Sequence, residues 1–94
     1  MIISIDYDDT WTADPQMWGR IVKMMRARGH TVIGVTNRPP FPQFMRGVKK
    51  DMGPYVEDII FAGPGPKREA AARMGYNVDV WIDDYPSAVD YGRR

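Results

Sequence analysis

The stretch IISIDYDDT, residues 2–10, carries the strongest signal in this chain. Its first four residues are apolar apart from one serine, and three carboxylates follow within four positions. A carboxylate taken out of water must be paired or must hold a metal. Asp6 and Asp8 lie on one side of the chain if it stays extended, and together they suit a hard divalent cation. The alternative is an acidic turn that only caps a helix.

Length and composition limit what the chain can be. Its 94 residues are enough for one domain, residues 1–94, with one core. Lys plus Arg number 13 against 12 Asp plus Glu, so the formal charge of +1 argues neither for nor against nucleic acid. The lack of cysteine excludes disulfides and a cysteine nucleophile. No apolar run approaches the ~18 residues of a membrane span and no signal-peptide pattern is present, so we expect a cytoplasmic protein without a membrane partner.

Short apolar runs alternate with segments of helical periodicity along the chain. The apolar runs predict strands at residues 2–6, 31–36, 56–61 and 78–82. Helices are predicted between them, near residues 15–28, 42–52 and 67–75, and a last helical turn at 86–91. Asp14 and Pro15 suit the start of the first helix, and Gly29 suits its end. This alternation predicts an α/β fold with right-handed crossovers, a parallel sheet and helices on both faces.

Side chains able to do chemistry follow three strands and begin the third helix: Asp6 with Asp8, Thr36, Lys67, and Asp83 with Asp84. In parallel α/β sheets, ligands bind beyond the carboxyl ends of the strands, so we expect these groups to converge there. The set suits phosphoryl transfer. A metal offsets the charge of a phosphoester, one carboxylate attacks, a second transfers protons, and a hydroxyl and an ammonium hold the phosphoryl oxygens.

Each of these residues also has a structural interpretation. Thr36 can simply end a strand, where β-branched residues are common. Lys67 can be a solvated residue, although a cation at a helix start opposes the helix dipole. Asp83 and Asp84 can be N-caps before a final helical turn. Arg38 either steers an anionic substrate or is a surface residue.

The four segments together resemble the haloacid dehalogenase superfamily of phosphatases, over nearly the whole chain. Its first motif, an apolar strand followed by Asp-x-Asp-x-Thr, matches residues 5–10, and its second, an apolar strand ending in Ser or Thr, matches 32–36. Its third motif, a lysine at a helix start, matches Lys67, and its fourth, an apolar strand ending in paired acids, matches 80–84. The resemblance implies a three-layer, Rossmann-like fold with about four strands in the order 4-1-2-3.

The resemblance also implies catalytic and metal-binding roles. Asp6 would be the nucleophile of a phosphomonoester hydrolase and a ligand of Mg²⁺. Asp8 would be the general acid and base, with its backbone carbonyl on the metal. Asp83, Asp84 or both would complete the Mg²⁺ site.

Binding of the phosphorylated substrate would fall to further residues of the same motifs. Thr36 would hydrogen-bond the phosphoryl group, and Lys67 would pair with it and offset the charge of Asp6. Thr10, Asn37 and Arg38 are the other candidate substrate-binding residues.

The chain departs from the family pattern by being short. Members usually carry a cap domain after the first or second motif, but here one helix fills the interval before Thr36, and one helix and one strand fill the interval before Lys67. A usual fifth strand has no counterpart. A capless site is open to water. We therefore expect either a macromolecular or nucleotide substrate, or a homo-oligomer in which a neighbouring copy covers the site.

Two other functional classes remain alternatives. A phospho-acceptor module of the receiver type would need an acid at the end of the third strand, where this chain has Phe61-Ala62-Gly63. A non-catalytic or regulatory module that binds phosphate or metal would keep the same residues without turnover. Metal titration combined with a phosphatase screen separates this second alternative from an enzyme.

Overall fold

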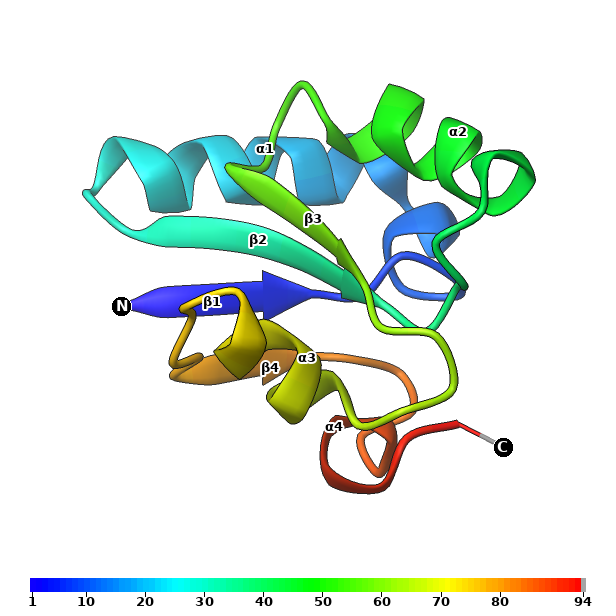
Figure 1. Ribbon diagram of the computed structural model, residues 1–94. Helices are drawn as coiled ribbons and strands as arrows, with labels where there is room; N and C mark the ends of the chain where they lie inside the picture. Colours follow the sequence, from blue (N-terminus) through cyan, green and yellow to red (C-terminus); the bar gives the residue numbers. More distant parts are fainter. Residues whose placement is uncertain (94) are drawn as a thin grey trace.

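Residues 1–93, which the computed structural model describes, form an α/β fold around a four-stranded parallel sheet (Figure 1). The strands lie in the order β3-β2-β1-β4, and the same row read from the other edge is β4-β1-β2-β3. The elements are β1 (Ile2–Ile5), a 3-10 helix (Trp11–Ala13), α1 (Pro15–Ala27), β2 (Thr31–Thr36), α2 (Pro42–Met52), β3 (Asp58–Phe61), α3 (Lys67–Arg73), β4 (Val80–Ile82) and α4 (Ala88–Tyr91).

Strand β1 is central and pairs on both sides. Ile5 lies opposite Gly34 of β2 on one side and opposite Ile82 of β4 on the other. The pairing continues one residue further, because the Asp6 amide donates to the Ile82 carbonyl at 2.9 Å. The residues after β1 and β4 therefore leave the sheet side by side.

Helices cover both faces of the sheet (Figure 1). α1 and α2 lie on one face, where Val22 and Val48 pack with Ile3 and Ile5 of β1. α3 lies on the other face, where Ala71 packs in a second cluster of buried side chains. β2 contributes alternate residues to the two clusters, as expected for a strand buried on both faces.

The first helix has the ends that the sequence predicts. The Asp14 carboxylate accepts a hydrogen bond from the Met17 amide at 3.1 Å, and Pro15 occupies the first helical position. Gly29 follows the helix with a φ of +89°, a conformation that side chains rarely adopt. The receiver alternative gains no support from β3, because this strand ends at Phe61 without an acid.

Four predicted boundaries were wrong by two residues, and one of them is the end of α3, which is Arg73 and not residue 75. β3 begins at Asp58 because the Val56 amide still bonds to the Met52 carbonyl at the end of α2. β4 begins at Val80, two residues later than predicted, and α4 begins at Ala88 because the preceding residues form a turn. The 3-10 helix after β1 was not predicted. Among the described residues, no helix combines the length and apolar character needed to cross a membrane.

Candidate functional site

Four of the predicted site residues lie at the ends of elements on one edge of the sheet. Asp6 directly follows β1 and Asp83 directly follows β4, while Thr36 is the last residue of β2. Lys67 is the first residue of α3, which begins after the loop that leaves β3 at the same edge (Figure 1). The parallel strand directions thus place the segments as the sequence predicts.

Lys67 is the buried centre of this group. Its side chain is only 2% exposed, and its Nζ donates to Asp6 Oδ1 at 2.7 Å and to Asp83 Oδ2 at 2.5 Å. A buried ammonium is tolerated only where anionic partners compensate for its lost hydration. The interpretation of Lys67 as a solvated residue is therefore wrong.

The carboxylate of Asp6 is also buried, and this changes its acidity. Burial raises the pKa of Asp6 from its ordinary value of 3.8 to about 7, while the hydrogen bond from Lys67 acts in the opposite direction. A further carboxylate, that of Asp84, also raises it. The carboxyl of Asp6 therefore changes between its protonated and ionised forms close to neutral pH.

Three carboxylates can meet around one ion. Asp6, Asp83 and Asp84 each offer an oxygen, and these oxygens lie within 4.8 Å of one another. An all-oxygen donor set suits Mg²⁺, which usually takes one or two carboxylates and keeps several waters. The residues present therefore fit the metal that the sequence predicts. The carboxylate of Asp8 is not part of this cluster.

Thr10 joins two of these carboxylates. Its hydroxyl donates to Asp84 Oδ1 at 2.9 Å, lies 3.3 Å from Asp6 Oδ2, and accepts the Asp84 amide at 3.1 Å. The pKa of Asp84 is lowered, chiefly by its hydrogen bond with Asp6 and also by Thr10. These bonds hold Asp6 and Asp84 relative to each other, and the substrate-binding role of Thr10 stays a prediction.

Asp8 and Arg38 form a two-pronged ion pair beside this cluster. Arg38 Nε and Nη2 donate to the two oxygens of Asp8 at 2.9 and 2.8 Å, and Nη1 donates to the Phe44 carbonyl at 3.0 Å. The guanidinium also lies over the ring of Tyr7, 5.0 Å from its centroid. Arg38 is therefore fixed by its neighbours, and it in turn fixes the second carboxylate of the first motif.

An open cavity of about 560 Å³ adjoins part of this group, and Lys67 is not among the residues that line it. Asp6, Asp8 and Thr36 line it together with Arg38, Phe44 and Arg93. Thr36 is 2% exposed, and its hydroxyl accepts the Arg38 amide at 3.2 Å. Asp83 and Asp84 line an adjacent cavity of about 360 Å³ together with Thr10. Asp6, the predicted nucleophile, thus lines the larger cavity, which has arginines at its rim. Asp83 and Asp84 line the smaller cavity next to it.

Asn37 lines the cavity and also holds a neighbouring loop. Its side-chain amide donates to the carbonyls of Gly63 and Gly65 at 2.8 and 3.0 Å. These bonds hold the loop that leads into Lys67. Sequence reasoning also missed Phe44 and Arg93 on the cavity rim, since neither belongs to a recognisable motif.

Comparison with protein-family models, with curated proteins and with solved structures found no match to this chain. The class of site is therefore defined by its own geometry: a buried lysine between carboxylates, a candidate cation cluster and an open cavity with arginines at its rim.

Proposed function

We propose that the protein is a Mg²⁺-dependent phosphomonoester hydrolase with an open, capless site on a Rossmann-like core of the haloacid dehalogenase type. One observation carries this proposal: the Lys67 ammonium bridges the carboxylates of Asp6 and Asp83 at the carboxyl edge of the sheet. An ion pair kept only for stability gains little from burial, because desolvation offsets much of the attraction. Positioned charges in a cavity are instead typical of sites that stabilise a developing anion.

The proposed reaction has two displacements on phosphorus. An oxygen of Asp6 attacks the phosphorus, the bond to the leaving oxygen breaks, and Asp8 gives its proton to that oxygen. Asp8 then takes a proton from a water molecule, whose oxygen attacks the aspartyl-phosphate and returns Asp6 as a carboxylate with release of phosphate. Lys67 and the Thr36 hydroxyl would hold the phosphoryl oxygens through both steps.

The metal would be held by Asp6 with Asp83, Asp84 or both. When bound, it neutralises charge on the phosphate and favours the ionised form of Asp6. The chain's own contribution is the fixed arrangement of these acids, in which Thr10 links Asp6 to Asp84 and Lys67 links Asp6 to Asp83.

The test is hydrolysis of an aryl phosphate with Mg²⁺ by the wild type and by two matched variants. Asp6→Asn removes the nucleophile and is expected to abolish phosphate release. Asp90→Asn makes the same chemical change at an exposed side chain of α4 that lines neither cavity, and is expected to retain activity. Equal turnover by Asp6→Asn and the wild type would exclude Asp6 as the nucleophile.

A non-catalytic module that binds metal or phosphate is the second candidate. The two-pronged pair between Arg38 and Asp8 favours it, because this contact occupies the carboxylate that would transfer protons. Calorimetric titration with Mg²⁺, followed by a screen of phosphorylated nucleotides, sugars and peptides, distinguishes the two candidates. Metal binding without turnover of any phosphoester would support the non-catalytic module.

A further inference from the structure

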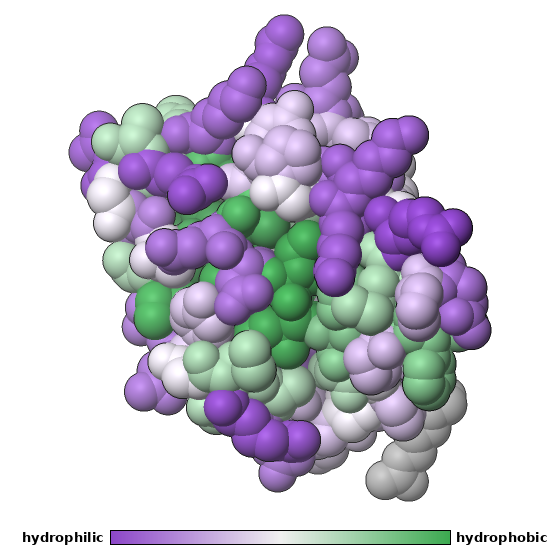
Figure 2. Space-filling view, turned by 45° about the horizontal axis from the view of Figure 1, so that its top comes forward, coloured by the Kyte–Doolittle hydropathy of each residue, from purple (hydrophilic) through white to green (hydrophobic). Residues whose placement is uncertain are grey.

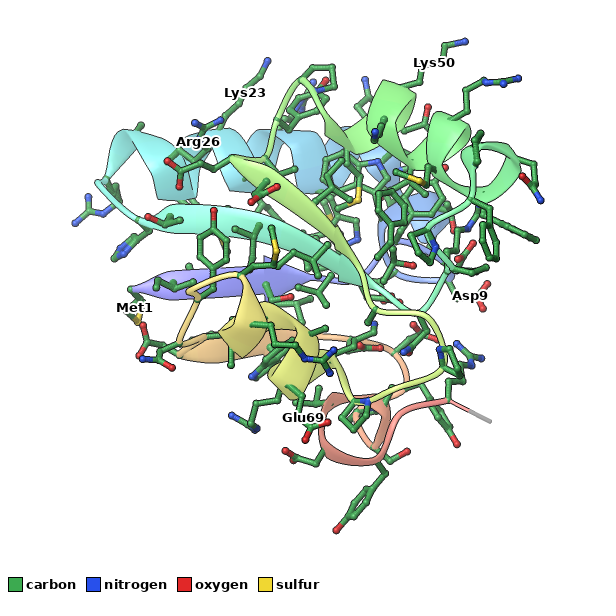
Figure 3. The ribbon with its side chains drawn as sticks, viewed as in Figure 1. Met1, Asp9, Lys23, Arg26, Lys50 and Glu69 are labelled. Atoms are coloured by element: carbon green, nitrogen blue, oxygen red, sulfur yellow. The ribbon has the colours of Figure 1, made fainter. Side chains whose placement is uncertain are left out.

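The outer side of α1 and α2 carries a concentration of positive charge. Seven exposed bases lie on these helices and at the end of α1, and we call them the basic layer: Arg20, Lys23, Arg26, Arg28, Arg46, Lys49 and Lys50. α1 contains no acid at all, and α2 contains one, Asp51, whose carboxylate accepts the Tyr7 hydroxyl. Figure 3 shows Lys23, Arg26 and Lys50 pointing away from the sheet on the same side, and Figure 2 shows hydrophilic side chains protruding over it.

The basic layer contains no ion pairs. Elsewhere in residues 1–93, Arg38, Lys67, Arg68 and Arg73 each contact a carboxylate, and Arg93 does not. None of the seven bases of the layer contacts a carboxylate in that part of the chain, although Arg26 Nη1 donates to the Tyr55 carbonyl at 2.7 Å. The formal charge of the whole protein, +1, therefore does not show how unevenly the charges are distributed. Bases without acidic partners gathered on one side attract a polyanion.

The basic layer is continuous with the candidate site through α2. Phe44, in the first turn of this helix, lines the cavity that contains Asp6 and Thr36. Arg46, Lys49 and Lys50 follow Phe44 by two, five and six residues, a rise of about 3–9 Å, and lie on the side of α2 that faces away from Phe44. A chain of phosphates that leaves the cavity past Phe44 would therefore cross the outside of α2 to reach these cations.

Two aromatic side chains lie at the start of α2, beside the cavity. Phe41 is 54% exposed and Phe44 is 40% exposed, both at the start of α2. Large exposed rings beside a row of cations are typical of proteins that stack the bases of a single strand while the cations follow its backbone. The arrangement thus offers contacts to bases as well as to phosphates.

We propose that the substrate is the phosphorylated end of a single-stranded nucleic acid. Its terminal phosphomonoester would enter the cavity at Asp6, its first bases would stack on Phe44 and Phe41, and its following phosphates would lie along Arg46, Lys49 and Lys50. This substrate class rests on the proposed phosphatase function. Binding along the basic layer, however, needs neither metal nor turnover, so it can be measured separately.

The test is fluorescence anisotropy with a labelled oligonucleotide of about 12 nucleotides, with a phosphate at one end, in EDTA. The wild type is expected to bind it more tightly as salt is lowered. Lys49→Gln with Lys50→Gln removes two contacts, each worth about 0.7 in the slope of log affinity against log salt for a single strand. We therefore expect the slope to fall by about 1.4 and affinity to fall roughly 20-fold at about 0.1 M salt.

The matched control removes two charges from the opposite side of the sheet. Arg68 and Arg73 lie on α3 and already pair with Asp90 and Glu69, so Arg68→Gln with Arg73→Gln is expected to leave binding within about twofold of wild type. Equal weakening by the two double variants would overturn the proposal. Absence of salt-dependent oligonucleotide binding would also overturn it, as would tighter binding to vesicles containing phosphatidylserine.

Two results separate this inference from the proposed function. Failure to hydrolyse an aryl phosphate together with strong oligonucleotide binding would overturn the phosphatase function and leave the nucleic-acid surface standing. Aryl phosphate hydrolysis without oligonucleotide binding would retain the phosphatase and overturn the substrate class proposed here. In a separate comparison with Mg²⁺ present, and with Asp6→Asn to prevent turnover, unphosphorylated oligonucleotide is expected to bind more weakly than the phosphorylated strand. Equal binding there would overturn entry of the terminal phosphate into the cavity.

Discussion

The ammonium of Lys67 lies 2.7 Å from Asp6 Oδ1, although 61 residues separate the two in the chain. One residue follows the first strand and the other begins the third helix. Their contact exists only when the parallel sheet and the loop before α3 are both formed. It therefore reports the integrity of the fold as well as that of the candidate site.

Replacing Lys67 by methionine should destabilise the metal-free protein strongly at neutral pH. The substitution keeps the length of the side chain but leaves the buried carboxylates of Asp6 and Asp83 without their cation, a loss of about 3–5 kcal/mol. Urea unfolding of the wild type and the variant at pH 7 measures this difference in the free energy of unfolding. Added Mg²⁺ should recover part of the loss, because the ion supplies positive charge to the same carboxylates. A change below about 0.5 kcal/mol would contradict the importance of this pair.

The stability of the metal-free protein should depend on the protonation of Asp6. Burial raises the pKa of this carboxyl to about 7 in the folded state, against 3.8 normally, so the folded protein binds more protons than the unfolded chain between these values. The contribution of Asp6 to the free energy of unfolding is then most favourable near pH 4. It decreases by up to about 4 kcal/mol as the pH rises to 7.

Asp6→Asn isolates this effect, since asparagine does not titrate. The stability of the variant relative to wild type should increase from about pH 4 to about pH 7 when both are unfolded by urea in EDTA. A constant or decreasing difference would show that the pKa of Asp6 is not raised. The lowered pKa of Asp90 acts on both proteins. The lowered pKa of Asp84 depends chiefly on Asp6 and can differ in the variant, but it affects stability only as the pH falls below the ordinary value of 3.8, outside this range.

Arg38→Lys tests whether Asp8 needs only a nearby positive charge or the two hydrogen bonds that Arg38 donates. Lysine keeps the positive charge on the cavity rim but cannot reproduce the two bonds from Arg38 to Asp8. If this pair positions Asp8 for proton transfer, kcat for an aryl phosphate should fall about tenfold while KM changes little. An increase in kcat would instead mean that Arg38 restrains Asp8. Steady-state kinetics of the wild type and the variant decide between these outcomes.

Gly92→Ala should disturb the loop that leads to Lys67. Gly92 has a φ of +78°, and a Cβ there would lie 2.3 Å from the Pro64 carbonyl oxygen. Gly75→Ala is the matched control, because Gly75 has a φ of +88° but nothing within 4 Å of the added carbon. Both variants carry the backbone strain, about 1 kcal/mol, and only Gly92→Ala should lose a further ~1–3 kcal/mol. Equal urea unfolding free energies would contradict this contact.

The arrangement of the main site was predictable because parallel strands share a direction. Once the strands were placed, Asp6, Thr36 and Asp83 had to emerge at one edge of the sheet. The burial of Lys67 was less accessible to sequence reasoning, since its position at a helix start is equally compatible with solvent. The structure identifies it as the shared partner of two carboxylates.

The remaining contacts depend on loop geometry that periodicity does not encode. Asn37 lines the cavity, but the sequence does not indicate that its amide bonds to the carbonyls of Gly63 and Gly65. Arg93 lies far along the chain from every other residue of the cavity, and only the turn after α4 brings it there. The sequence shows two groups of bases, at residues 20–28 and 46–50. That they lie on the same side of the protein follows only from the structure, in which α1 and α2 cover the same face of the sheet (Figure 1).

The central place of β1 has a consequence for how the protein folds. β1 precedes β2 and β3 in the chain, and its second neighbour in the sheet, β4, follows both of them. A chain in which β4 has not yet docked therefore has Asp6 without the two other acids of the candidate cation cluster. Docking of β4 beside β1 would have to precede any binding of an ion by all three carboxylates.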